Sequence, residues 1–522
     1  MAVNIPSPAP RALVLVVDPK AGLRVREGNV ISIEEGVDVV PLRDLLNEEQ
    51  AAIRPLYGVS EEWLKHRTSS TKALMGVGQR LDLSIFYKVT CPDDKLKSLA
   101  DRLRKLSIVQ SAYIKPDADL PFIDTGDEPA AGPPLGVVTD DFTKHQRYLN
   151  AAPEGIDARY AWTKEGGGGR GVKIIDIEGA WRFSHEDLLA NPGGCVGGIP
   201  ISKRKWRKHG TAVLGILSGD HNDLGIAGIC PDADVNTISI FNNSDGNPSP
   251  DWGIAAAIRL AADMLCPGDI ILIEDHRPGP AVNFQENENT QDGYIPVEWW
   301  PCNMAAILYA NSRDIIVVEA GGNGRQDLDD QIYCQNPPAP HGPFPHWWRN
   351  PFKRNPIDTG AILVGAGLPP HDPPDSGFAP DRSRWELSNH GAVIDTQGWG
   401  EEVATSGGNG DLTPRGTEED RQYTSRFNGT SSAAAMVAGA LGCLQGVLRA
   451  SGGALNPASA RALLQDDVLG SPQQDGPLGP ANLETIGPRP DLRKLINHLI
   501  PPFSFKRMVG ALIKALLGQR LK

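Results

Sequence analysis

Residues 428–446 read NGTSSAAAMVAGALGCLQG, and this stretch decides the fold. After the Gly429-Thr430-Ser431 turn, nearly every position carries a small or apolar residue. A helix that is apolar on nearly every side is expected at the centre of a domain. Its amino end presents free backbone N–H groups and the positive end of the helix dipole, which suits Ser431 to a reaction with a developing oxyanion. A buried helix with a Thr or Ser cap is the simpler alternative.

Two further stretches contain the histidine and the carboxylate that a nucleophilic serine needs. The sequence KHGTAVLGILSG (208–219) predicts His209 at the start of another helix, followed by a small, apolar face. The sequence GVKIIDIEG (171–179) places Asp176 at the end of a short apolar strand. Carboxylates that emerge at such strand ends meet at the edge where α/β sheets bind ligands. Each residue alone is equally compatible with a structural role.

A fourth stretch, DIIVVEAGGNG (314–324), ends a predicted strand in a glycine-rich turn. The side-chain amide of Asn323 can donate a hydrogen bond to an oxyanion, beside the backbone N–H of Ser431. The alternative is a simple turn asparagine, which Gly324 favours. The candidates therefore follow one another along the chain in the order Asp176, His209, Asn323 and Ser431.

Short apolar runs separated by helical segments predict an α/β fold between residues 156 and 485. Runs of this kind suit buried parallel strands, so we expect a doubly wound, mainly parallel sheet with helices on both faces. The clearest runs are VKIID (172–176), DIILIE (269–274), DIIVVEA (314–320) and AILVGA (361–366).

The remaining sequence divides into three regions. Residues 1–116 contain a predicted strand (83–91), an amphipathic helix (93–106) and a second strand (108–116), which indicates a small α+β domain. Residues 117–155 are rich in Pro and Gly and predict an extended linker. Residues 486–522 end in a basic, amphipathic helical tail that can bind an anionic membrane surface or a partner, or can pack on the rest of the chain.

The composition indicates a globular protein and argues against several other classes. The chain has 522 residues, 40% hydrophobic and 22% charged, as expected of a globular protein. A formal charge of -13 argues against a nucleic-acid partner. Seven widely spaced cysteines form no metal motif and no dense disulfide framework. The first residues lack the features of a secretory signal, so we expect a cytoplasmic protein or one exported by another route.

Taken together, these stretches resemble those of the subtilisin-like (S8) serine peptidases. His209-Gly210-Thr211 matches the His box of the family, Gly429-Thr430-Ser431 with Ala433 matches its Ser box, and Asn323 matches its oxyanion asparagine. The resemblance also covers HEDL (185–188) and GIAGICPDADV (225–235). It implies a serine endopeptidase with the triad Asp176, His209 and Ser431, no required cofactor, and protein or peptide substrates.

The resemblance extends to the amino-terminal region. This region is similar to the ferredoxin-like propeptide of the family, which implies a zymogen whose own domain acts as an intramolecular inhibitor. The segment KPDADLPF (115–122) is then expected to lie in the cleft like a product. The alternative is a permanent accessory domain.

The chain also departs from the family pattern. The Asp box continues with Ile177-Glu178-Gly179 instead of Ser or Thr and Gly, which adds a carboxylate near His209. Glu274, Asp275 and His276 stand where the family usually has a Ser and Gly pattern. We expect these three residues to border the substrate cleft and to favour basic side chains.

Two other functions remain open from the sequence. A catalytically silent scaffold would act as a binding module, and a membrane-surface protein would depend on residues 501–522. Many relatives bind calcium, and Asp327, Asp329 and Asp330 are candidate ligands.

Overall fold

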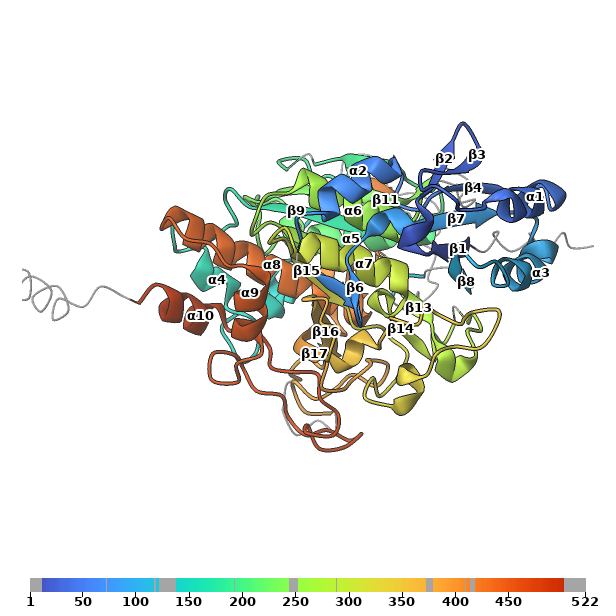
Figure 1. Ribbon diagram of the computed structural model, residues 1–522. Helices are drawn as coiled ribbons and strands as arrows, with labels where there is room; N and C mark the ends of the chain where they lie inside the picture. Colours follow the sequence, from blue (N-terminus) through green and yellow to red (C-terminus); the bar gives the residue numbers. More distant parts are fainter. Residues whose placement is uncertain are drawn as a thin grey trace, which may run out of the picture.

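The computed structural model describes residues 12–71, 73–116, 119–121, 138–191, 193–243, 252–287, 289–371, 379–408, 410–413 and 418–501. Figure 1 shows a large α/β unit with a smaller amino-terminal unit (blue) beside it. Residues 117–118 and 122–137 of the predicted linker, and residues 502–522 of the tail, lie outside the described residues.

The large unit is built on a seven-stranded sheet in which every pairing is parallel. Its spatial order is β10 (Cys195–Ile199), β11 (Asp234–Asn242), β9 (Lys173–Glu178), β12 (Ile270–Ile273), β15 (Ile316–Ala320), β16 (Ile362–Gly367) and β17 (Ile394–Trp399). After β9 the chain forms the edge strand β10 and then β11, which lies between β10 and β9; it next crosses to β12 and runs outward through β15, β16 and β17. The switch point of the topology therefore lies between β9 and β12, where α/β sheets bind ligands.

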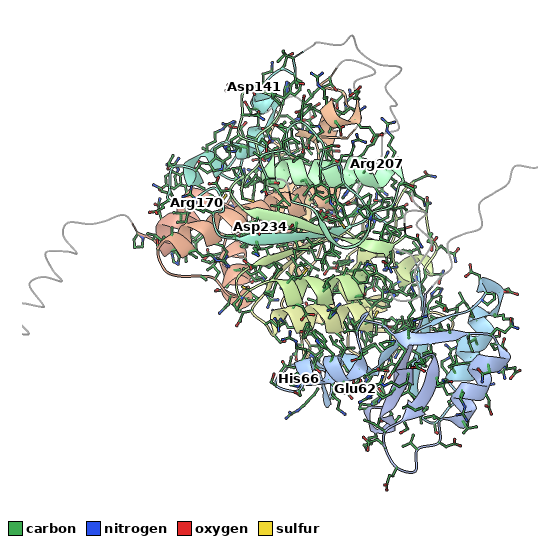
Figure 2. All side chains as sticks on the ribbon, turned by 90° about the horizontal axis from the view of Figure 1, so that it is seen from above. Glu62, His66, Asp141, Arg170, Arg207 and Asp234 are labelled. Atoms are coloured by element: carbon green, nitrogen blue, oxygen red, sulfur yellow. The ribbon has the colours of Figure 1, made fainter. Side chains whose placement is uncertain are left out.

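Helices cover both faces of this sheet and confirm the doubly wound fold. α5 (Arg204–Ser218) and α8 (Gly429–Ala450) pack against each other on one face, and α6 (Ile254–Met264) packs with α7 (Pro301–Asn311) on the other. Figure 2 shows Arg207, on α5, and the α6–α7 pair on opposite sides of the strand that carries Asp234. By length and composition α8 could cross a membrane, but 94% of its most apolar window is buried, as predicted for a core helix.

The amino-terminal unit has the predicted ferredoxin-like fold. A four-stranded antiparallel sheet runs in the order β4 (Ala52–Pro55), β7 (Phe86–Thr90), β1 (Ala12–Val17) and β8 (Val109–Lys115). α1 (Val40–Glu48) and α3 (Asp93–Leu103) connect its strands. Leu96, Leu99 and Leu103 are buried, because their spacing places them on one face of α3.

Direct contacts dock this unit onto the side of the large unit that carries α6 and α7 (Figure 1). The Tyr57 hydroxyl donates to the carbonyl of Cys302 in α7 at 2.8 Å, and Arg259 Nε in α6 donates to the carbonyl of Tyr57 at 3.2 Å. Ser111, in β8, donates to the carbonyl of Pro343 at 2.6 Å. The last strand of the unit is therefore held against the large unit.

The large unit extends beyond residues 156 and 485, the borders predicted for the catalytic domain. Residues 143–149 form two short 3-10 turns, and Tyr148 is fully buried against Trp399. After residue 485, Arg489 is fully buried and α10 (Leu492–Leu499) packs on α8. Thus the described parts of the predicted linker and tail belong to the packed domain.

The other regular elements are shorter or peripheral. They are β2 (Leu23–Arg26), β3 (Asn29–Ser32), α2 (Glu61–Thr68), β5 (Leu74–Gly76), β6 (Gln79–Arg80), α4 (Ala158–Ala161), β13 (His276–Pro278), β14 (Tyr294–Pro296), β18 (Val403–Ser406), β19 (Tyr423–Phe427) and α9 (Pro457–Leu464).

Candidate active site

Ser431 lies in the first turn of α8 and is fully buried. Gly429 opens the helix with a φ of +94°, a conformation that L side chains rarely adopt. The turn leaves the backbone N–H of Ser431 without a partner inside the helix. This N–H donates to the carbonyl oxygen of Pro121 at 3.4 Å. The amino end of α8 therefore binds a carbonyl oxygen, as an oxyanion site must.

His209 is fully buried in α5, and Glu178 is its carboxylate partner. Nδ1 of His209 lies 2.7 Å from Oε2 of Glu178, the last residue of β9. The ring also packs edge-on against Phe427. Burial, helped by the positive charge of Lys205, lowers the pKa of His209 well below its ordinary value. The imidazole is therefore neutral near pH 7 and can accept a proton.

The structure corrects the predicted pairing of Asp176 with His209. Oδ2 of Asp176 accepts a hydrogen bond from Nε1 of Trp181 at 2.6 Å, while the imidazole is held by Glu178. Residues two apart on a strand share one face, so the Asp-Ile-Glu order directs both carboxyls to the same side of β9. Glu178 stands at the carboxyl end of the strand, and Asp176 lies deeper in the sheet.

The neighbouring Gly210 makes room for this arrangement. A Cβ atom at Gly210 would lie 2.3 Å from the carbonyl oxygen of Ala180 and 2.7 Å from Oε1 of Glu178. Any side chain at this position of α5 would therefore force the Ala180 carbonyl, the Trp181 ring or the Glu178 carboxylate to move.

Four buried carboxyls gather at the switch point between β9 and β12. Asp176, Glu178, Glu274 and Asp275 are all fully inaccessible. Burial, with the negative charges of the other three, raises the pKa of Glu178 well above its ordinary value. Burial also raises the pKa of Asp176 to about 7, although Trp181 opposes this shift. Like charges this close cannot all be ionised, so the cluster holds protons at neutral pH.

The predicted residues Glu274, Asp275 and His276 follow β12 directly and are fully buried. Burial and the charge of Asp176 raise the pKa of Glu274, and an interaction with Ser431 lowers it. Burial raises the pKa of Asp275, against the lowering effect of Arg277. The backbone of His276 pairs with that of Asp119, with both N–H to O distances at 3.1 Å. Of the three, His276 contacts the chain segment in the cleft.

Asn323 is anchored beside Ser431. Its Oδ1 accepts hydrogen bonds from the N–H and the hydroxyl of Thr430 at 3.0 and 3.1 Å. Its Nδ2 donates to Oε1 of Gln291 at 3.0 Å, and its own N–H donates to Nδ1 of His276 at 3.3 Å. These contacts fix the carboxamide next to the amino end of α8, with its oxygen on Thr430 and its NH₂ on Gln291.

Residues 119–121 of the chain itself lie across this site, as the sequence predicted for the segment 115–122. Asp119 forms an antiparallel bridge with His276, and the carbonyl of Pro121 faces the N–H of Ser431. The carboxylate of Asp119 accepts from Nζ of Lys205 at 2.9 Å, one turn before His209 on α5. The tripeptide thus joins the helix of the histidine to the helix of the serine.

Gln291 is a contact residue that the sequence did not single out. Its Nε2 donates to the carbonyl of Leu120 at 2.7 Å, while its Oε1 accepts from Asn323. Gln291 is fully buried and has a φ of +55°, which is rare for a residue other than glycine. The stretch NENTQDG (287–293) is polar and carries no motif, so only the fold reveals this residue.

The predicted calcium ligands are not gathered into one site. Asp327 accepts from the N–H of Asp329, Asp330 caps the N–H of Ile332, and Asp329 accepts from Ala392 and Lys353. Within the described residues, no group of three or more His, Cys, Asp or Glu side chains could hold a metal ion.

Comparisons with known proteins agree with this geometry. The model of the subtilase family, Peptidase S8, matches residues 196–483, more than half of the chain. An intracellular serine protease of Paenibacillus polymyxa is 29% identical over 134 residues, which cover 23% of this chain and 40% of that protein. The chain therefore aligns with less than half the length of this relative.

Two solved structures share the fold. Fervidolysin from Fervidobacterium pennivorans, a keratinolytic enzyme related to subtilisin, has a TM-score of 0.53 and 15% identity, covering 97% of this chain and 63% of its own. The epidermin leader peptide processing serine protease of Staphylococcus aureus has a TM-score of 0.52 and 14% identity, covering 95% and 100%. The family match, together with this fold and the arrangement around Ser431, shows that the chain belongs to the subtilase family of serine peptidases.

Proposed function

We propose that this protein is a serine endopeptidase made as a zymogen, with Glu178, His209 and Ser431 as its catalytic triad. The observation that carries the proposal is the carbonyl of Pro121 on the N–H of Ser431, where the carbonyl of a substrate must lie for attack. The buried Glu178–His209 pair supplies a neutral base with a fixed orientation.

Each residue then has a distinct role in acyl transfer. His209 takes the proton of Ser431 as the hydroxyl oxygen bonds to the carbonyl carbon. Glu178 accepts from Nδ1–H and stabilises the imidazolium that forms. The N–H of Ser431, with the amide of Asn323, holds the oxyanion. The imidazolium then protonates the leaving amine, and water hydrolyses the acyl-enzyme with His209 as base.

The amino-terminal domain inhibits the enzyme by filling the cleft with residues 119–121. Its contacts with α6 and α7 hold it in place, so a substrate cannot reach Ser431 until this segment leaves. In this register the carbonyl carbon of Pro121 is the one that Ser431 would attack. Attack at this carbon would leave Pro121 on the serine and release the amine of Phe122.

The purified full-length chain tests the proposal. After incubation, we expect mass spectrometry to find an amino terminus at Phe122 and a fluorophosphonate adduct on Ser431. The Ser431→Ala variant should show neither product and should lose about 10⁶ in turnover of casein, the magnitude known from subtilisin itself. A wild-type chain that stays intact, unlabelled and inactive on casein would refute the assignment.

A further inference from the structure

Asp119 occupies a built site within the cleft. Its Oδ1 accepts from Nζ of Lys205 at 2.9 Å, and its Oδ2 lies 3.5 Å from Nε2 of Gln291. Only 10% of the Asp119 side chain and 25% of the Lys205 side chain are exposed. The N–H and the carbonyl of Asp119 both form hydrogen bonds with the backbone of His276. This strand-like pairing sets the direction of the Asp119 side chain.

The contacts of the tripeptide define its register. Because the carbonyl of Pro121 faces Ser431, Asp119 is the residue two positions before the scissile carbonyl. Leu120, between them, is fully buried and gives its carbonyl to Gln291. The position of Asp119 is therefore one that a peptide substrate would also occupy.

We propose that Lys205 determines specificity, selecting substrates with an Asp or Glu side chain two positions before the scissile carbonyl. This inference rests on the proposed function and names its substrate class. An acid at that position forms a partly buried, charge-assisted hydrogen bond, which is stronger than a neutral one. A lysine there would place two ammonium groups together and lose the contact to Gln291.

The surrounding charges agree with this assignment. Arg204 and Arg207, on either side of Lys205 along α5, pair with Glu419 at 3.4 and 3.2 Å. Asp275 interacts with Arg277, whose positive charge offsets the repulsion between the carboxyls of Asp275 and Asp119. The preference for basic side chains that the sequence suggested stays a prediction, and the acid seen in the cleft argues against it.

A peptide series tests the role of Lys205 in the self-processed enzyme. The substrate is a quenched fluorescent decapeptide with the sequence of residues 116–125, carrying Asp, Asn or Lys at the position of Asp119. We expect kcat/KM to be about tenfold higher for Asp than for Asn, and lowest for Lys. Enzyme concentration is set by fluorophosphonate titration, and the cleaved bond is identified by mass spectrometry.

Charge reversal supplies the decisive comparison. Lys205→Glu should reverse the order of the Asp and Lys peptides. The control Lys203→Glu makes the same change in net charge at an exposed residue and should keep the wild-type order. Equal cleavage of the three peptides by the wild type, or an unchanged order in Lys205→Glu, would overturn this inference and leave the peptidase intact. Failure to cleave casein or to label Ser431 would instead overturn the proposed function.

Discussion

At the scale of single residues, the protein carries two acids, Asp176 and Glu178, where a subtilase triad needs one. They share one face of β9, but only Glu178 reaches Nδ1 of His209, at 2.7 Å. Each carboxyl influences the titration of the other, so the two behave as a coupled pair. The assignment of the triad therefore depends on which of the two is functionally replaceable.

Neutral variants of the two acids should differ in activity. Glu178→Gln should lower kcat by about 10⁴, because an amide can donate to His209 and favour the wrong tautomer. Asp176→Asn should stay within about tenfold of the wild type, because its oxygen can still accept from Trp181 and its NH₂ can donate to Glu178. Turnover of the quenched decapeptide measures both. If Asp176→Asn were the more damaging change, Asp176 would be the triad carboxylate.

Sequence alone could not separate these two acids. The apolar run before Asp176 predicts a strand that ends in an acid, and the Asp-Ile-Glu order is the only sign that a second acid lies on the same face. The family match begins at residue 196, beyond this strand. The distance to His209 depends on where β9 ends relative to α5, which is a property of the whole sheet.

At the scale of elements, α5 contributes three residues to the site. Lys205 contacts the tripeptide, His209 contacts Glu178 four residues later, and Gly210 leaves space for that carboxylate. Residues four apart lie on the same face of a helix, so the spacing of Lys205 and His209 brings both to the cleft. The sequence predicted α8 well, because its apolar positions are continuous. The prediction for α5 was wrong at its start, because the helix begins at Arg204, five residues before His209.

Gly210→Ala should therefore be harmful, although alanine normally stabilises a helix by about 0.5–1 kcal/mol relative to glycine. The new Cβ would force Glu178 or the neighbouring Ala180 and Trp181 to move, so we expect kcat to fall by at least about 10² and thermal stability to fall with it. Gly453→Ala is the control, since the nearest atom to its Cβ would be 3.8 Å away. Full activity in Gly210→Ala would show that these groups can move without disturbing the site.

Elements without periodicity were harder to predict. Residues 143–149 lie in a stretch whose Pro and Gly content indicated a linker, yet Tyr148 is fully buried and donates to the carbonyl of Ala404 at 2.9 Å. Average composition hides a single buried aromatic residue of this kind. Gln291 was missed for a related reason, since its role comes from a turn that the fold brings to the cleft.

At the scale of the whole molecule, folding buries a cluster of four acids near the site that residues 119–121 cover. Asp176, Glu178, Glu274 and Asp275 have raised pKa values because burial disfavours their charged forms. An acid whose pKa is higher in the folded state than in the unfolded chain binds extra protons on folding. Stability is then lost as pH rises from the unfolded pKa to the folded one.

For Asp176 this window runs from the ordinary value of 3.8 to about 7. The corresponding loss is at most roughly 4 kcal/mol, at about 1.4 kcal/mol per pKa unit. Asparagine does not titrate, so Asp176→Asn should become more stable relative to its parent as pH rises from 5 to 7. Above pH 7 the difference should stay constant, because the wild-type carboxyl is then ionised in both states.

The measurement is best made by calorimetry in the Ser431→Ala background, where the proposed chemistry would not cut the chain during heating. His209 opposes the trend, since its lowered pKa makes the fold lose stability as pH falls below the ordinary value of 6.5. The two proteins compared are the Ser431→Ala variant and the double variant that also carries Asp176→Asn. His209 contributes to the stability of both, so its effect largely cancels in the difference between their melting temperatures. A difference in melting temperature that does not change between pH 5 and 7 would mean that Asp176 is ionised throughout this range, and would contradict the raised pKa of this carboxyl.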